Sequence, residues 1–227
     1  MLFRSKLAAI IPAAGSGERL GHALPKALVQ VGQHCILYHA VAGAISHVDQ
    51  VIVAAPSGSE HIFEHSIKEF VPAVKVVTGG EIRSASVASA LKHIDKEITH
   101  VLVHDAARAF TPASVYLEVI HALSQGKDAV IPALPMVDTI KRVKDQLVLS
   151  TEERAALVRV QTPQGFKRDL LERAHEKSSG DPNADDAFLV EQLGERVHIV
   201  MGHEDAFKIT VPNDLVLANL VVNRGRL

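Results

Sequence analysis

Aromatic residues and cysteine are scarce in this chain of 227 residues. Aromatics make up 4% of it and tryptophan is absent, which argues against stacking of nucleic-acid bases on aromatic side chains as a main binding mode. The single cysteine, Cys35, has no partner for an internal disulfide. Such cysteine usage is typical of a reducing compartment, so we expect a cytoplasmic protein.

The chain also has no large excess of basic or acidic residues. The chain has 24 basic and 26 acidic residues, and its formal net charge is −2. Nucleic-acid-binding domains usually carry a basic excess, so no nucleic-acid partner is expected. A site for phosphate would have to be a local cluster of cations rather than a property of the whole surface.

The apolar run near the N-terminus, Leu7–Ala14, is short. A helix that spans a bilayer needs about 20 apolar residues. The run ends in Pro-Ala-Ala-Gly and lacks the longer apolar core of a signal peptide. No membrane partner is therefore expected.

Short apolar runs alternate with longer amphipathic stretches along the chain. Five runs rich in Val, Ile and Leu are Leu7–Pro12, Val51–Ala55, Val74–Val77, Val101–Val103 and Ala129–Pro132. Helix-like segments lie between them, around 36–46, 59–70, 83–93 and 113–123. Continuous apolar runs fit strands that are buried on both faces of a parallel sheet. The order predicts one α/β domain over residues 1–227, with a Rossmann-like, doubly wound, mostly parallel sheet.

Residues 134–150 depart from this alternation of apolar runs and amphipathic stretches. Apolar and polar residues alternate there around a Lys-Asp-Gln turn, which predicts an antiparallel hairpin. We expect an arm at about 134–155 that projects from the sheet. An isolated hairpin is only marginally stable in water, so the arm is expected to pack on a second subunit. Beyond the arm, the pattern predicts helices near 167–177, 185–193 and 213–222 and a strand at 197–201.

The strongest local motif is a glycine-containing loop directly after the first predicted strand. It reads Pro12-Ala13-Ala14-Gly15-Ser16-Gly17-Glu18-Arg19-Leu20 and is followed by Leu24-Pro25-Lys26. Small residues let backbone N–H groups approach a triphosphate closely, and Arg19 and Lys26 supply positive charge beside it. A dinucleotide-binding fingerprint is excluded because it needs glycine where Leu20 stands, and no Gly-Lys-Ser/Thr follows for a Walker A loop. An ordinary glycine turn at a strand end is the alternative.

The pattern Pro-Ala-Ala-Gly-x-Gly-x-Arg followed by Pro-Lys resembles the signature of sugar-phosphate nucleotidyltransferases. Within that superfamily the chain is most similar to the 2-C-methyl-D-erythritol 4-phosphate cytidylyltransferase family, and the resemblance covers nearly its whole length. The other matching segments are Gly79-Gly80-Glu81-Ile82-Arg83-Ser84-Ala85-Ser86-Val87, Val103-His104-Asp105-Ala106-Ala107-Arg108, Asp138-Thr139-Ile140-Lys141, Gln161-Thr162-Pro163-Gln164 and Phe207-Lys208-Ile209-Thr210.

The resemblance implies transfer of CMP from CTP to a small polyol phosphate, with Mg²⁺ or another divalent cation as the cofactor and release of pyrophosphate. It implies three catalytic cations, which are Arg19, Lys26 and Lys208. The implied nucleotide-binding residues are Ala13, Ala14, Gly15, Gly17, Gly80, Glu81, Ser86, Asp105 and Ala106. The implied acceptor-binding residues are Asp105, Arg108, Thr139, Arg154 and Lys208.

Asp105 and the arm have the most specific implied roles. Asp105 follows a predicted buried strand, where open α/β sheets bind ligands, and it is a candidate ligand for a Mg²⁺ ion that the triphosphate mainly holds. The family resemblance implies a homodimer in which each arm brings Thr139 and Arg154 into the partner's site. Asp185 and Asp186 are further candidates to line the acceptor pocket.

Several alternatives remain open at this point. Ser86 suits the N-cap of a helix, Arg154 suits an exposed helix charge, and Asp105 with Arg108 suits a structural ion pair. The nearest functional alternative is a ribitol 5-phosphate cytidylyltransferase, and more distant ones are a uridylyl- or guanylyltransferase. A non-catalytic nucleotide-binding domain is the alternative from a different class.

Overall fold

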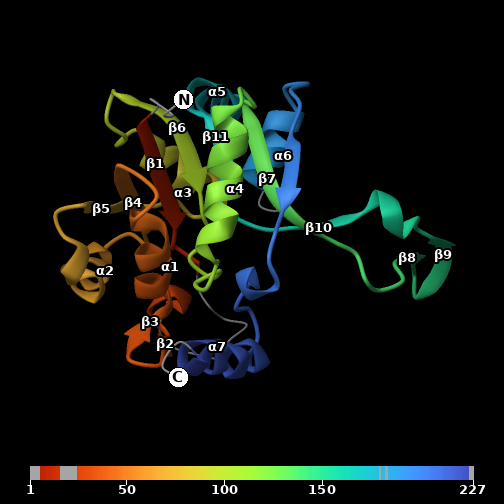
Figure 1. Cartoon of the computed structure of the whole chain (residues 1–227), viewed down its shortest axis with the longest axis horizontal. Helices are drawn as coiled ribbons and strands as arrows, with labels where there is room; N and C mark the ends of the chain where they lie inside the picture. The colour runs from red at the N-terminus through yellow and green to blue at the C-terminus, as the bar shows by residue number, and fades with distance from the viewer. Residues whose placement is uncertain (1–5, 16–24, 179, 182–183, 225–227) are drawn as a thin grey trace.

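Figure 1 shows the computed structural model of the chain, in which helices cover both faces of a central sheet and one hairpin stands away from it. The structure describes residues 6–15, 25–178, 180–181 and 184–224. Within these ranges, no helix combines the length and the apolar character needed to cross a bilayer.

One half of the eight-stranded sheet is entirely parallel. Its strands are β1 (Lys6–Pro12), β4 (Gln50–Ala55), β5 (Val74–Thr78) and β6 (Ile98–Val103), in the spatial order β6-β1-β4-β5. In β1, Leu7 to Ile11 are all buried, because helices pack on both faces of the strand. The mostly parallel α/β sheet predicted from the apolar runs is confirmed.

The other half of the sheet is mixed. It contains β7 (Ala129–Pro135), β10 (Val158–Val160), β11 (Gln164–Lys167) and β12 (His198–Met201). β11 lies between β6 and β7 and is antiparallel to both, β10 is antiparallel to β7, and β12 is parallel to β7. The sequence predicted no strand at 158–167, and that part of the prediction is wrong. These strands are too short and too polar to form an apolar run, and β11 contains Gly165, where a Cβ would lie 2.5 Å from a methyl carbon of Val119.

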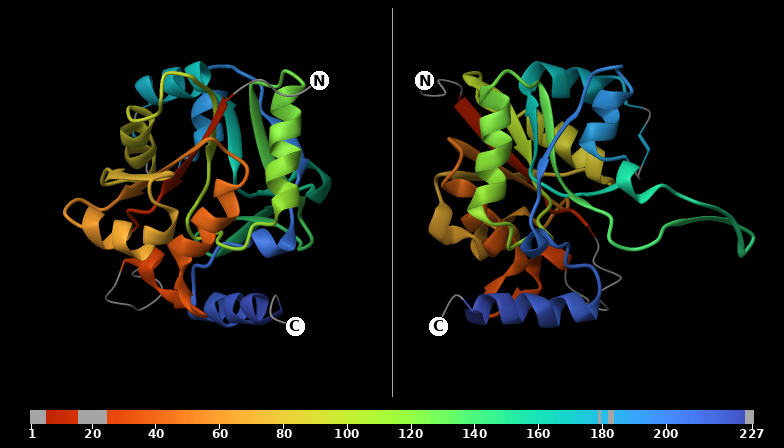
Figure 2. Two further views of the ribbon diagram at one scale, coloured as in Figure 1. Left: turned by 60° about the vertical axis from the view of Figure 1, so that its left-hand side comes forward. Right: turned by 45° about the vertical axis from the view of Figure 1, so that its right-hand side comes forward.

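The helices form two layers (Figures 1 and 2). One core cluster joins the sheet to α1 (Ile36–Ile45), α2 (Glu60–Ser66) and α4 (Ala113–Ser124). The other joins it to α3 (Arg83–Leu91), α5 (Arg168–Glu176) and α6 (Asp186–Glu191). Successive residues of β1 alternate between the clusters, with Ala9 in the first and Ile10 in the second. This period of two is the physical basis of the doubly wound arrangement.

A third, smaller core lies at one end of the molecule. It packs α7 (Pro212–Arg224) against the short pair β2 (Gln30–Val31) and β3 (His34–Cys35) through Ile36, Ile209 and Ala218. The final helix was predicted, but the β2–β3 hairpin was not, because two-residue strands leave no periodic signal. Likewise, the helix predicted at 59–70 is α2 followed by a separate 3-10 turn, η3 (Lys68–Phe70).

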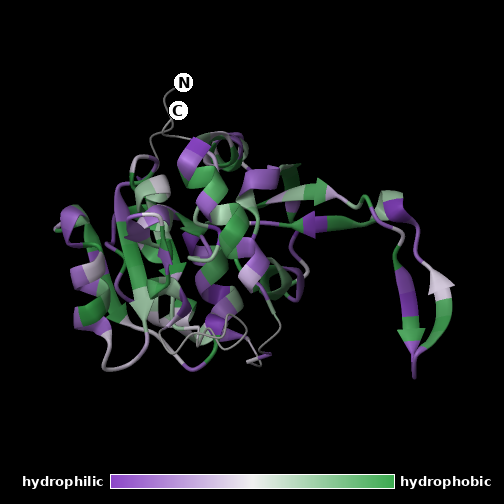
Figure 3. Ribbon diagram, turned by 90° about the horizontal axis from the view of Figure 1, so that it is seen from below, coloured by the Kyte–Doolittle hydropathy of each residue, from purple (hydrophilic) through white to green (hydrophobic). Residues whose placement is uncertain are grey.

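A hairpin is confirmed as β8 (Lys141–Lys144) and β9 (Leu147–Thr151), which pair antiparallel. It is shorter than the predicted stretch 134–150, because Leu134 and Pro135 belong to β7 of the main sheet. Asp145 and Gln146 connect β8 to β9 with φ angles of 48° and 65°, and the positive φ angles match the twist of a tight two-residue turn. The arm containing this hairpin projects away from the sheet (Figure 1). Figure 3 shows apolar residues on the hairpin, and the side chains of Leu147 and Val148 are 70% and 61% exposed.

Candidate active site

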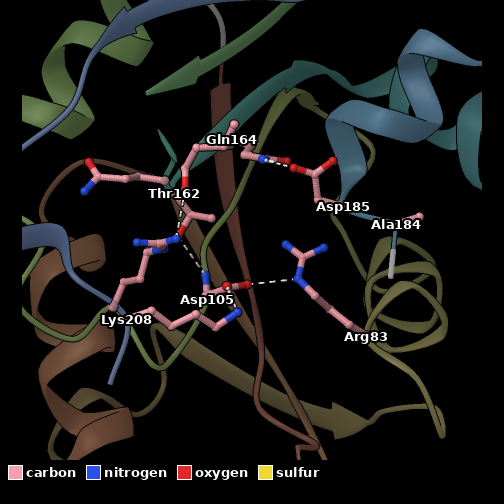
Figure 4. A pocket seen from close by; sticks show the side chains of 10 residues that line it. Arg83, Asp105, Thr162, Gln164, Ala184, Asp185 and Lys208 are labelled. Carbon is pink, nitrogen blue, oxygen red and sulfur yellow. Dashed lines mark hydrogen bonds and ion pairs between the residues drawn. The ribbon is translucent and has the colours of Figure 1, made fainter. Parts of the chain in front are cut away.

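A cavity of about 260 Å³ opens beyond the carboxyl end of β6, where open α/β sheets bind ligands (Figure 4). Charged and polar side chains dominate its wall. The lining residues are Arg83, Asp105, Arg108, Val160, Gln161, Thr162, Gln164, Ala184, Asp185 and Lys208. They come from segments far apart in the sequence, so only the folded chain creates the site.

Asp105 lies at the centre of this wall and is 8% exposed. Its Oδ1 accepts a hydrogen bond from Arg83 Nε at 2.9 Å, and its Oδ2 accepts one from Lys208 Nζ at 2.8 Å. Its backbone N–H donates to Thr162 Oγ1 at 3.0 Å. Burial acts to raise the pKa of Asp105, but the two cations outweigh it and hold this pKa well below its usual range. The cavity therefore contains a fixed carboxylate.

Arg83, the first residue of α3, bridges two carboxylates. Besides its bond to Asp105, its Nη1 donates to Asp186 Oδ2 at 2.6 Å. Burial acts to lower the pKa of Arg83, but Asp186 and Asp105 raise it above its ordinary value. Asp186 is fully buried, and its Oδ1 lies 2.9 Å from Nε2 of His175. The buried carboxylate of Asp186 thus holds Arg83 in place while Arg83 lines the cavity.

Arg108 follows Asp105 in a tight turn, in which the Arg108 N–H donates to the Asp105 carbonyl at 2.9 Å. The guanidinium donates from Nη1 to Ala206 O at 2.7 Å and from Nη2 to Val160 O at 3.0 Å. Its Nε is buried and makes no hydrogen bond within the described part of the chain. Burial lowers the pKa of Arg108. A positioned guanidinium with unused N–H groups is suited to an anion.

Lys208 enters from the segment between η5 (Glu204–Ala206) and α7. The backbone N–H of Ile209 donates to Ala107 O at 2.8 Å, which ties this segment to the turn that contains Asp105. The Lys208 side chain remains 42% exposed, so it is the most accessible charge of the three that meet at Asp105.

The two predicted nucleotide-binding loops lie beside each other. Ala13 follows β1 and donates its N–H to Ala54 O at 2.9 Å, and Gly79 follows β5 and donates to Ala55 O at 2.7 Å. A Cβ at Gly79 would lie 3.3 Å from the Cβ of Ala14. The same Cβ would lie 2.9 Å from Ser86 Oγ and 3.1 Å from Ala55 O, so the absence of a side chain at Gly79 favours this close packing of the two loops.

Ser86 stabilises the second loop from within. Its buried Oγ accepts from Gly80 N at 3.1 Å and lies within hydrogen-bonding distance of the carbonyls of Gly80 and Ile82. The alternative that Ser86 caps helix α3 is wrong, since Ile82 is the N-cap and no side chain caps this end. Glu81 is exposed on the loop.

The remaining predicted residues are not all at the cavity. Ala106 is buried directly after Asp105, and Lys26 begins the 3-10 turn η2 (Lys26–Leu28), outside the cavity lining. Arg19 and Gly17 lie outside the described residues. Thr139 and Arg154 are exposed, and neither lines the cavity of its own chain. Arg154 Nη1 donates a hydrogen bond to Val137 O at 2.8 Å, another residue of the arm.

Sequence reasoning gave no role to several residues that build the site. Arg83 was missed, although it follows a predicted strand at the same edge of the sheet as Asp105. Gln161 exchanges two hydrogen bonds with the backbone of His203, and Gln164 donates to Asp185 at 2.7 Å. Of the two aspartates predicted near the acceptor pocket, Asp185 lines the cavity while Asp186 is buried behind it.

Comparisons with known proteins agree on one family. The family model described as 2-C-methyl-D-erythritol 4-phosphate cytidylyltransferase matches residues 7–224. The enzymes of that name from Streptomyces avermitilis and Rhodococcus opacus are 47% and 48% identical to this chain, and each match covers 98% of this chain and 94% and 97% of the respective relative.

Solved structures give the same result. The 4-diphosphocytidyl-2C-methyl-D-erythritol synthase from Anaerococcus prevotii superposes with a TM-score of 0.84 at 30% identity, covering 97% of this chain and 99% of that one. The 2-C-methyl-D-erythritol 4-phosphate cytidylyltransferase from Thermus thermophilus gives a TM-score of 0.80 at 36% identity, covering 96% and 99%.

Proposed function

This chain belongs to the 2-C-methyl-D-erythritol 4-phosphate cytidylyltransferase family, and from that membership we propose that it transfers CMP from CTP to 2-C-methyl-D-erythritol 4-phosphate. The products are 4-diphosphocytidyl-2-C-methyl-D-erythritol, an isoprenoid precursor, and pyrophosphate. The names of the relatives support this acceptor and give no support to the ribitol 5-phosphate alternative. The same names support an enzyme rather than a non-catalytic nucleotide-binding domain.

The observation that carries the proposal is the cluster of cations around Asp105. Arg83, Arg108 and Lys208 line one cavity at the carboxyl edge of the sheet. CTP and a sugar-alcohol phosphate are both highly anionic, so a site that joins them has to offset their repulsion. A preorganised set of cations in a partly desolvated cavity does this.

The reaction requires no base and no covalent intermediate. The acceptor's phosphate oxygen is already an anionic nucleophile, and it forms a bond to the α-phosphorus of CTP as the bond to the β-phosphate oxygen breaks. The enzyme lowers the barrier by alignment and by charge stabilisation. In this proposal Arg108 holds the acceptor phosphate, Lys208 stabilises the α-phosphate, and Arg19 and Lys26 stabilise the leaving pyrophosphate.

We assign the cytidine to the two adjoining loops. Ala13, Ala14 and Gly15 on the first, with Gly17 beyond them, present small residues and backbone groups to the triphosphate and ribose. The second loop presents Gly80 and Glu81. The internal hydrogen bonds of Ser86 support a role in holding this loop in shape for backbone contacts with the base.

The donor set of the cavity fits a magnesium ion. Asp105 is ionised, and its two oxygens offer about four acceptor positions, of which Arg83 and Lys208 occupy two. Mg²⁺ typically takes one or two protein carboxylates and completes its shell with water and substrate phosphates. Asp105 would hold such an ion, which would neutralise charge on the triphosphate when bound.

We also propose a homodimer in which each arm (134–155) completes the partner's acceptor site with Thr139 and Arg154. The exposed apolar side chains of the arm support this, since they would be covered by a second copy. They are Val137, Val143, Leu147, Val148 and Leu149. In this view residues 1–227 act as one nucleotidyltransferase domain. The buried free thiol of Cys35 fits the cytoplasm, where thiols stay reduced.

The proposal is tested by pyrophosphate release from CTP and Mg²⁺ with a panel of polyol phosphates. Turnover with 2-C-methyl-D-erythritol 4-phosphate should exceed that with ribitol 5-phosphate, and UTP and GTP should be poor donors. Release that is independent of any acceptor, or a preference for ribitol 5-phosphate, would refute it. Near-normal turnover of both Lys26→Ala and Lys208→Ala would refute the assigned roles of the cations.

A further inference from the structure

A buried polar pair lies directly behind the cavity. His175 on α5 and Asp186 on α6 have side chains that are 4% and 0% exposed, and Nε2 of the histidine lies 2.9 Å from Oδ1 of the aspartate. Neither residue lines the cavity. Removing a carboxylate from water is costly, and apolar residues could have joined these helices instead. The pair therefore calls for an explanation beyond packing.

The pair is the inner end of a chain of hydrogen bonds that reaches the cavity. Asp186 Oδ2 accepts from Arg83 Nη1 at 2.6 Å, and Arg83 Nε donates to Asp105 Oδ1 at 2.9 Å. Asp105 Oδ2 accepts from Lys208 Nζ at 2.8 Å. These hydrogen bonds thus run without a break from helix α5 through α6 and α3 to Asp105, two residues after β6, and to Lys208.

Resting on the proposed function, we propose that His175 and Asp186 are positioning residues that fix Arg83, and through it Asp105, for CMP transfer. The fork of a guanidinium directs two N–H groups at two carboxylates in set directions. Asp186 is immobilised by burial and by His175. One side of the Arg83 guanidinium is therefore held by a fixed carboxylate, while its other side binds Asp105 at the cavity.

The difference in exposure between Lys208 and Arg83 explains why Arg83 would need to be fixed by Asp186. The Lys208 side chain is 42% exposed and the Arg83 side chain 23%. Lys208 has to turn from Asp105 toward a phosphate to assist the reaction, and its flexible stem allows that movement. Arg83 then remains as the partner that keeps Asp105 ionised and oriented.

A purely structural role is the competing explanation, in which the pair only joins α5 to α6. That role affects stability and leaves the turnover of the folded enzyme unchanged. The test compares His175→Leu, which removes the donor at similar size, with His175→Gln, whose amide nitrogen can occupy the place of Nε2. Leu171→Val is the matched control, because it weakens the buried face of the same helix without touching the chain of hydrogen bonds.

We expect His175→Leu to lower kcat by roughly 10-fold or more, the range for outer partners that orient a functional group. KM for CTP should change less, because the loops that hold the cytidine stay in place. His175→Gln should recover most of the lost kcat, and Leu171→Val should lower the melting temperature alone. A folded His175→Leu enzyme with wild-type kcat would overturn the inference. If His175→Leu does not fold, Asp186→Asn replaces it, with the same expected loss of kcat.

A double-mutant cycle with Arg83→Lys separates action through Arg83 from any other route. Lysine keeps the charge but cannot reach both carboxylates as a fork. In that background His175→Leu should cause little further loss of kcat, whereas independent, additive losses would contradict the inference.

The wild-type assay with CTP and the panel of acceptors is run first, so that the two proposals fail separately. If the wild-type enzyme transfers CMP to none of them, the proposed function is wrong. The inference is then decided by the crystal structure of His175→Leu. Displacement of Arg83 from Asp105 would support it, and an unchanged bridge between Asp105 and Asp186 would overturn it.

Discussion

The cavity and the arm carry residues of the same proposed acceptor site in opposite physical settings. At the cavity, Asp105 is buried and Arg108 is half-buried, and hydrogen bonds from several elements fix them. On the arm, which projects from the sheet (Figure 1), Thr139 and Arg154 are exposed and are not part of the cavity lining. In the proposed dimer, the chain positions one half of the acceptor site by itself, and the partner subunit would position the other half.

This difference separates stability from function. Buried charges at the cavity are coupled to the core, so changing one affects both folding and catalysis. The arm projects away from the sheet (Figure 1), so changes there should affect catalysis through the proposed dimer and leave the core intact. The predictions below test that separation, beginning with the largest expected effect.

Asp105→Asn should give the largest loss, because it removes the charge that two cations share. We expect kcat/KM to fall by roughly 10³-fold, the upper range for one preorganised electrostatic group. The free energy of unfolding should fall by about 3 kcal/mol, since Arg83 and Lys208 lose the charge of their partner. Pyrophosphate-release kinetics and denaturant unfolding measure the two effects. Loss of activity with unchanged stability would show that the cavity is not coupled to the core.

Lys208→Ala and Arg154→Ala should each lower kcat by roughly 10²-fold, or about 2.7 kcal/mol of transition-state stabilisation. The decisive measurement dissociates the two impaired variants, mixes them and lets them reassociate. If the arms are exchanged, one of the two sites in each mixed dimer contains neither change, and about a quarter of wild-type turnover should return. Refolding each variant alone is the control. No recovery would mean that Arg154 acts in its own chain or not at all.

Acid should destabilise the core and spare the arm. Burial lowers the pKa of His104, next to Asp105, to about 4. Between this value and the ordinary value of about 6.5, the unfolded chain binds a proton that the folded chain does not, so stability is present above about pH 6.5 and is lost as the pH falls toward 4. The loss due to His104 should be roughly 3 kcal/mol.

Denaturant unfolding of the wild-type protein and of His104→Asn between pH 7 and pH 4 measures this effect. Asparagine does not titrate and can keep the bond that His104 makes with Thr162. Burial also lowers the pKa values of His39, His47 and His100, so the difference between the two proteins isolates His104. Residues 134–155 contain no histidine. Identical pH profiles for the two proteins would contradict the prediction.

The sequence predicted the parallel half of the fold for a physical reason. Strands covered by helices on both faces have to be continuously apolar, and such runs stand out. Strands β10 and β11 escaped detection because they are short, partly polar and defined by pairing with residues far away, such as Gly165 with Leu102. Two-residue strands such as β2 carry no periodicity at all.

The residues of the candidate site were predicted or missed for a similar reason. Asp105 and Arg108 were predicted because a strand end and a recognisable string mark them. Arg83 was not, because its role depends on Asp186, 103 residues away in the sequence. Pairings at that distance exist only in the folded chain, and a single sequence gives no signal for them.

A substitution at the tip of the arm should have a weaker effect than the changes described above. Gln146 has a φ angle of 65°, which glycine adopts without strain, and Asp-Gly is a preferred pair for this type of turn. Gln146→Gly should therefore stabilise the hairpin by about 0.5–1 kcal/mol and leave kcat unchanged. Hydrogen exchange should slow at the amides of β8 and β9 and stay the same in β6. Slower exchange in β6 as well would show that the arm and the sheet unfold as one unit, and the proposed separation of the two regions would then be wrong.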